Sequence, residues 1–219
     1  MKLTVREAAA VLNVPETKVY RWIDNEEIPF VMIRHHPMFH RLELLEWALE
    51  MELPVHVDLY EDDAHQPFTS ALVRGGGHRA GERLEDIATD LPIPPPDRET
   101  IRALLATRAT EMFVSRGADR IAMPKARSPI ICAGAAPAIL LWWCENRGVV
   151  LSEVPTNAVF LIVAPTIHRH LQLLSRLSLA LHDRAFKTAV QHTDAFDEVV
   201  NEARRWEVAV EAARTGGAR

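Results

Sequence analysis

The chain has 219 residues, of which 48% are hydrophobic and 25% are charged, and its formal net charge is -5 at pH 7. These values are typical of a globular protein with one small module and one ordinary domain, and they exclude broad, nonspecific nucleic-acid binding by the whole chain. The two cysteines, Cys132 and Cys144, lie in apolar runs, which favours buried thiols in a reducing cytosol. We expect a cytoplasmic protein without signal peptide or membrane span, because proline and glycine interrupt the longest charge-free run, residues 128–144.

The first fifty residues predict two helices joined by a short turn. Thr4 and Glu7 have the spacing of a capping box, which opens the first helix. Residues 13–15 (Asn-Val-Pro) predict the turn, with Pro15 near the first position of the second helix. On that helix the spacing predicts an inward face of Val19, Trp22 and Ile23 and an outward face of Thr17, Lys18 and Arg21.

A β-hairpin and a third helix are expected next. Residues 28–39 predict two short strands around a turn at His35-His36-Pro37. Residues 41–51 predict a helix with Leu44, Leu45, Trp47 and Ala48 in its core.

This order of elements resembles the excisionase/MerR-like winged helix-turn-helix, over residues 1–53. The matching segments are 3–9 (Leu-Thr-Val-Arg-Glu-Ala-Ala), 19–22 (Val-Tyr-Arg-Trp), 28–29 (Ile-Pro) and 44–47 (Leu-Leu-Glu-Trp). Pro15 departs from the family, which usually has a capping serine there. The resemblance implies that DNA is a partner. The major groove would be contacted by Thr17, Lys18, Tyr20 and Arg21, and phosphates by Arg34, His35, His36 and Arg41 of the wing.

The charge of this module limits what it does alone. Residues 1–41 carry six Lys/Arg against five Asp/Glu, so a lone module would bind DNA weakly and would require a dimer or adjacent sites. The alternative is a solvated helix face on a module that contacts proteins. We expect no metal and no cofactor, because no cysteine or carboxylate is spaced to complete a site with His35, His36 and His40.

Residues 54–69 predict a linker between two domains. After it, residues 74–79 (Arg-Gly-Gly-Gly-His-Arg) predict a flexible loop, because no apolar strand directly precedes them and no phosphate-binding Lys-Ser/Thr follows. Residues 91–96 are rich in proline and predict an extended segment, and Asp97 is expected to cap a helix.

The second domain is predicted to be α/β, over residues 70–208, followed by a flexible tail at 209–219. The continuous apolar runs 138–144 and 158–164 are typical of strands that are buried on both faces. Thr166 is expected to cap an amphipathic helix, and a last helix is expected from Thr193. Strands covered on both faces predict a three-layer α/β/α domain with a central mixed sheet.

This domain resembles the type-2 (fructose/mannitol) enzyme IIA domains of the bacterial sugar phosphotransferase system. The matching segments are 121–125 (Ile-Ala-Met-Pro-Lys), 159–165 (Val-Phe-Leu-Ile-Val-Ala-Pro), 170–177 (His-Leu-Gln-Leu-Leu-Ser-Arg-Leu) and 182–186 (His-Asp-Arg-Ala-Phe). In that family a histidine accepts a phosphoryl group, and Lys125 stands at its position here. A lysine has an ordinary pKa of ~10.4 and no free lone pair at neutral pH, so the phosphoryl transfer is expected to be lost.

The rest of the predicted site also departs from the family. His170 corresponds to the second histidine of the family, which stabilises the transferring group. The family's arginine falls at Ala109, one position from Arg108, and Arg120 replaces the glycine before Ile121. We expect no catalysis but an anion-binding site formed by Lys125, Arg127 and His170, with Arg108 nearby. The alternative is that Lys125 pairs with an acidic neighbour and the cleft is filled.

These patterns favour a transcriptional regulator with a non-phosphorylatable IIA-like domain that senses or docks something. Its further partners would be phosphocarrier proteins of the phosphotransferase system or an anionic metabolite, with a homodimer as a possible assembly and no membrane contact. Two alternatives remain open. The chain is a phosphocarrier that uses His170 or a perturbed Lys125, or it is a pure interaction protein.

Overall fold

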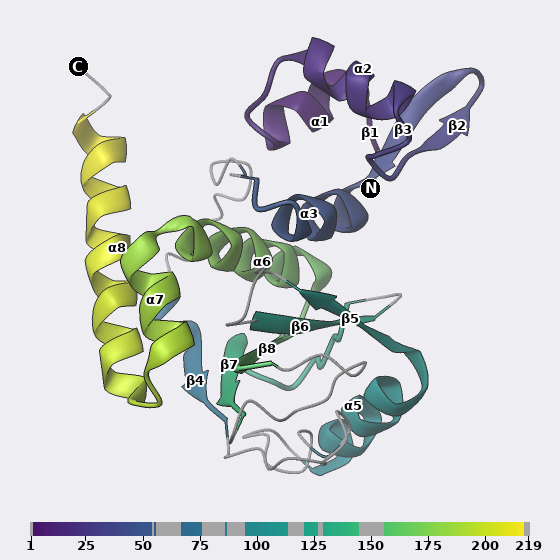
Figure 1. Cartoon of the computed structure of the whole chain (residues 1–219). Coiled ribbons are helices and arrows are strands. Elements are labelled where there is room, and N and C mark those ends of the chain that lie inside the picture. The colour runs from purple at the N-terminus through teal and green to yellow at the C-terminus, as the bar shows by residue number, and fades with distance from the viewer. Residues whose placement is uncertain are drawn as a thin grey trace.

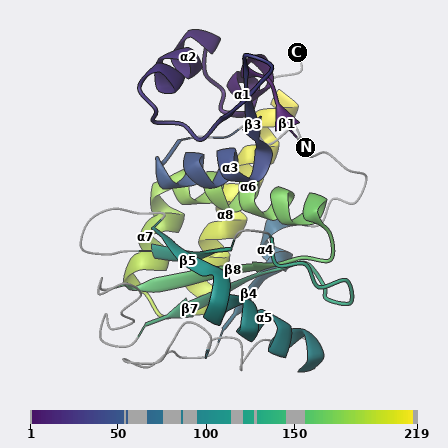
Figure 2. The same ribbon diagram turned by 90° about the vertical axis from the view of Figure 1, so that its right-hand side faces the viewer.

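The computed structural model describes residues 2–53, 55, 67–75, 86, 95–113, 121–126, 129–144 and 156–216. It contains two sheets, a small one near the N-terminus and a larger one with helices on both faces (Figures 1 and 2). The expectation of a mixed α/β protein is therefore confirmed. That the larger sheet is arranged as in the IIA domains stays a prediction. None of the described helices is both long and apolar enough to span a membrane.

The N-terminal unit contains three helices and a three-stranded antiparallel sheet of order β1-β3-β2. Its elements are β1 (Lys2–Leu3), α1 (Val5–Val11), α2 (Glu16–Asp24), β2 (Val31–Ile33), β3 (His36–His40) and α3 (Arg41–Glu50). The predicted capping box opens α1, since the Thr4 amide donates to Oε2 of Glu7 at 2.8 Å and the Glu7 amide donates to Oγ1 of Thr4 at 3.3 Å. Pro15 is the N-cap of α2, one residue before its first helical position.

The hairpin turn lies one residue earlier than predicted. Arg34 and His35 form it, with φ values of 47° and 65°, while His36 and Pro37 belong to β3. The register pairs Ile33 with His36, so only two residues remain for the turn, and a two-residue hairpin turn requires positive φ. Pro37 therefore occupies a strand position opposite Met32 instead of marking the turn.

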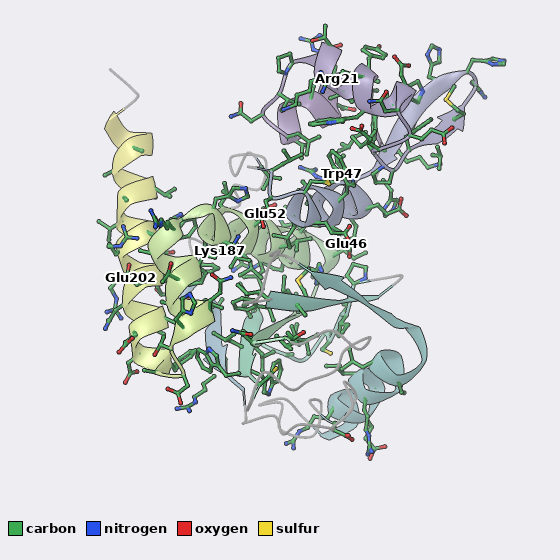
Figure 3. The ribbon with its side chains drawn as sticks, viewed as in Figure 1. Arg21, Glu46, Trp47, Glu52, Lys187 and Glu202 are labelled. Atoms are coloured by element: carbon green, nitrogen blue, oxygen red, sulfur yellow. The ribbon has the colours of Figure 1, made fainter. Side chains whose placement is uncertain are left out.

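Helix α3 is buried on nearly all sides because it packs between the N-terminal unit and helix α6. The ring centroids of Trp47 and Trp22 lie 5.0 Å apart in an edge-to-face contact, which packs α3 against α2. Its other side packs on α6 (Ile167–His182), and Glu46, which is only 6% exposed, points toward this helix (Figure 3). The hydrophobic core is consequently continuous from the N-terminal unit into the rest of the protein.

The larger sheet has five strands in the order β4-β7-β8-β6-β5 and is mixed. The remaining elements are α4 (Phe68–Ala71), β4 (Leu72–Arg74), α5 (Pro95–Arg108), β5 (Ala109–Phe113), β6 (Ile121–Ala126), β7 (Ala138–Trp143), β8 (Ala158–Val163), α6, α7 (Arg184–His192) and α8 (Phe196–Gly216). The two buried strands predicted from apolar runs are β7 and β8, and Thr166 caps α6 as predicted.

Alternate residues of the central strands face two separate cores. Leu141 and Phe160 belong to the core that contains α6, α7 and α8, whereas Leu140 and Leu161 belong to the core that contains Ile101 of α5. Phe68, at the end of the predicted linker, packs edge-to-face on Phe186 and Trp206 in the first of these cores.

The premise that no strand precedes residues 75–79 and the expectation of an extended segment through Pro95 and Pro96 were both wrong. A short strand, β4, directly precedes Gly75, and a Cβ at Gly75 would lie 2.2 Å from ring atoms of Trp142, so only glycine allows this approach. Pro95 and Pro96 begin α5 instead of extending the preceding segment, because the first turn of a helix needs no amide donors. Asp97 consequently lies inside the helix. Residues 76–79 and 91–94 lie outside the described residues.

Candidate nucleic-acid interface

Helix α2 presents a polar face to solvent. Val19 is fully buried and Trp22 is 6% exposed, so these two side chains anchor the helix to the core. The side chains predicted to face outward are all exposed: Thr17, Lys18, Tyr20 and Arg21. Nζ of Lys18 lies 5.0 Å from the ring centroid of Trp22, which is a cation–π contact. The contact restrains the side chain but does not neutralise its positive charge.

The body of the protein leaves this face accessible. Helix α2 lies on the side of the N-terminal unit that is remote from the larger sheet, and α3 lies between the two (Figures 1 and 2). Arg21 projects from the same remote side (Figure 3). The larger sheet therefore does not cover α2.

The hairpin β2–β3 places the other predicted contacts. Arg34, His35 and His36 are exposed at its tip, whereas Arg41 is half-buried at the start of α3. Hydrogen bonds from the backbone and hydroxyl of Thr4, with a smaller contribution from the charge of Arg41, hold the pKa of Glu7 below its ordinary value.

The exposed second helix, the hairpin and the supporting third helix agree with a comparison against protein families. The family model of a helix-turn-helix domain matches residues 3–51. This segment is a helix-turn-helix domain. The match supports a DNA-binding role. It also supports the helix-turn-helix resemblance predicted for residues 1–53. No curated protein matches the chain, and no comparison supports the resemblance to IIA domains.

The predicted anion site lies at one edge of the larger sheet. Strands β6 and β8 run parallel, so residue 125, near the carboxyl end of β6, and α6, which follows β8, meet at the same edge. The backbone of Lys125 pairs with Thr110 of β5. The side chains of Lys125 and Arg108, and Arg127 as a whole, lie outside the described residues.

His170 brings a neutral ring to this edge. It lies in the first turn of α6, is only 9% exposed, and its Nδ1 has no hydrogen-bond partner among the described residues. Burial lowers its pKa to about 4, so the imidazole is uncharged at pH 7. The fixed positive charge expected of the site therefore receives no contribution from His170, and any anion there would depend on lysine and arginine.

The described part of the chain also holds a groove that the sequence did not indicate. It has a volume of about 650 Å³ between α7 and α8 and is lined by Arg184, Ala185, Thr188, Ala189, Glu198, Asn201 and Glu202. Glu202 is already bound by Arg205 at 2.6 Å. The lining contains both basic and acidic side chains, and these residues form no sequence motif that would have predicted the groove.

Proposed function

We propose that this protein is a DNA-binding transcriptional regulator, in which the helix-turn-helix domain contacts DNA and residues 70–208 sense or dock a second partner. The observation that carries the proposal is the exposed polar face of α2 on a matched helix-turn-helix domain. In such domains the second helix enters the major groove, so Thr17, Lys18, Tyr20 and Arg21 are the side chains that would reach DNA.

The small charge of the domain requires a second copy on the DNA. The balance of six basic against five acidic residues over 1–41 releases few counterions on binding. Two protomers on adjacent half-sites would double the number of phosphate contacts and raise the affinity accordingly. We therefore propose a homodimer on DNA.

The larger domain is proposed to have no phosphoryl-transfer activity. Lys125 occupies the position of the phosphoryl acceptor in the IIA domains that this part of the chain resembles, and a lysine ammonium cannot attack phosphorus. His170 is neutral but buried, so a phosphorylated donor protein cannot reach its ring without local opening. A sensing or docking role for the domain is consistent with both observations.

Selection from a random-sequence duplex pool, followed by a mobility-shift assay with the full chain, tests DNA binding. Lys18→Ala should weaken binding to all sequences and lower the salt slope by about 1. Arg21→Ala should also relax the preference at one base pair, at a cost of ~1–3 kcal/mol. Arg204→Ala, an exposed position on α8, is the matched control and should bind as the wild type does. Failure to enrich any sequence would favour the pure interaction protein.

Incubation with phosphoenolpyruvate, enzyme I and the phosphocarrier protein tests the second part. Mass spectrometry under conditions that preserve phosphohistidine should detect no added phosphate. A stoichiometric phosphate on His170 or Lys125 would establish the phosphocarrier alternative instead.

A further inference from the structure

The wing of the helix-turn-helix domain has an unusual charge composition. Residues 28–42 contain two arginines, three histidines and no aspartate or glutamate, in a chain whose net charge is -5. An imidazole is the side chain whose ordinary titration falls between pH 5 and 8. The charge of this segment therefore ranges from +2 with neutral histidines to +5 with protonated ones.

The hairpin holds two of the histidines at its tip. Arg34 and His35 form the turn, and His36 is the first residue of β3, so three consecutive exposed side chains gather at one end of the wing. The tip projects away from the larger domain (Figure 1). Phe39 is fully buried, and because side chains alternate along a strand, His36 and His40 lie on the opposite, solvent-facing side of β3.

The charged neighbours of the histidines lie on β1, α1 and α3. The elements packed against β3 carry Lys2 on β1, Arg6 and Glu7 on α1, and Arg41, Glu43, Glu46 and Glu50 on α3. The carboxylate of Glu7 is engaged by Thr4. Within the described residues, no carboxylate is paired with His35, His36 or His40. The three rings are therefore available to an external anion.

The three histidines are not equivalent. His36 lies opposite the uncharged Ile33, whereas His40 lies opposite Lys2 on the same face of the sheet. His40 is also the last residue of β3, at the end opposite the turn, so the tip holds only His35 and His36.

We propose that the tip of the wing is a phosphate-binding surface whose charge is set by protonation of His35 and His36, so that DNA binding tightens as the pH falls. This inference rests on the proposed function and adds its regulation. When both rings are neutral, Arg34 is the only charge at the tip. Protonation adds two cations, and the DNA phosphates themselves favour the protonated rings. Each additional neutralised phosphate releases counterions and steepens the salt dependence of binding by ~0.9.

The experiment measures the affinity of the full chain for a duplex selected from a random pool, by fluorescence anisotropy at about pH 6 and about pH 8 over a range of salt concentrations. The affinity should be on the order of tenfold higher at the lower pH, and the salt slope should be steeper by about 2. His35→Gln/His36→Gln should bind with the weaker affinity at both pH values. His35→Arg/His36→Arg should bind with the tighter affinity at both.

The matched control is His168→Gln/His192→Gln, which removes two exposed imidazoles remote from the wing. It should retain the full pH dependence of the wild type. The inference is overturned if wild-type binding is independent of pH, if the pH dependence survives in His35→Gln/His36→Gln, or if the control abolishes it. Absence of binding by both the wild type and His35→Arg/His36→Arg, at either pH, would overturn the proposed function instead.

Discussion

Nε2 of His182 lies 2.7 Å from the carbonyl oxygen of Glu52, across the junction between the helix-turn-helix domain and α6. Nδ1 of the same ring lies 2.7 Å from the carbonyl oxygen of Ser178. Both partners are acceptors, so only the doubly protonated ring donates to both at once. The carboxylate of Glu52 is held separately by Nζ of Lys187 at 3.2 Å (Figure 3). Residue 52 is thus attached to the larger domain through its backbone and through its side chain.

We expect His182→Ala to lower the free energy of unfolding by about 1–2 kcal/mol, because it removes the contact with Glu52 across the junction and the contact with Ser178 within α6. Lys187→Ala should cost less than about 1 kcal/mol, because its ion pair is exposed to solvent. Urea denaturation of the full chain measures both, with Arg204→Ala as the control. An unfolding midpoint of His182→Ala equal to that of the wild type would show that the contacts of His182 do not stabilise the junction.

Gly75→Ala should be destabilising, whereas Gly134→Ala should be nearly neutral. A Cβ at Gly75 would meet the buried ring of Trp142 at 2.2 Å, but nothing lies within 4 Å of one at Gly134. Overpacking of this kind costs ~1–3 kcal/mol, and the ring cannot move without disturbing the core around α5. Thermal denaturation of the two variants provides the comparison. Equal melting temperatures would mean that the strand end at Gly75 moves away from the ring at little cost.

The stability of the protein should depend on the protonation of His170. Its folded-state pKa of about 4 is below the unfolded value of 6.5, so the unfolded chain binds the proton more readily. The stability that results is complete above pH 6.5 and is lost as the pH falls toward 4. His170→Gln should remove this dependence. Between pH 7 and pH 4, the free energy of unfolding should therefore fall less in the variant than in the wild type, by up to about 3 kcal/mol.

Urea denaturation of both proteins between pH 4 and 7 measures the difference between their free energies of unfolding at each pH. The titration of the carboxylates, which are common to both proteins, cancels in this difference. Parallel pH profiles for wild type and variant would show that the ring is solvated and titrates normally.

An anion should stabilise the folded protein if Lys125 and Arg127 form the predicted site at the edge of the larger sheet. A ligand that binds only the folded state raises the melting temperature. A thermal-shift panel of phosphate, sulfate and sugar phosphates should therefore contain at least one stabilising compound, and Lys125→Ala should abolish its effect. A flat panel, or a shift that survives the substitution, would support the alternative of a filled cleft.

The local parts of the fold were predictable in both domains, because they depend on short-range chemistry. The Thr4–Glu7 capping box, the outward face of α2 and the apolar strands β7 and β8 follow from spacing alone. The turn at Arg34-His35 was predicted one residue too late, because Pro37 in the sequence indicates a turn. In the structure Pro37 pairs with Met32 inside the hairpin. Pro95 shows the same limitation, since a proline that ends one element can also begin the next.

The tertiary relationships were not predictable in the same way. Leu44, Leu45, Trp47 and Ala48 were expected in the core of α3, but the burial of Glu46 depends on α6, more than a hundred residues later. The neutral state of His170 likewise depends on what covers it, which no local pattern records. The contact of Gly75 with Trp142 joins two strands that are distant in sequence.

Helix α3 packs against both α2 and α6 within one continuous core, and this has a consequence for how the protein would bind an operator. A DNA-binding helix that is joined to the rest of its protein by a flexible linker can bind half-sites at many separations. Here α3 packs directly on both α2 and α6, which sets the orientation of α2 relative to the larger domain. In a symmetric pair, the distance between half-sites and their relative orientation would then be determined by whichever surface of the larger domain meets its twin.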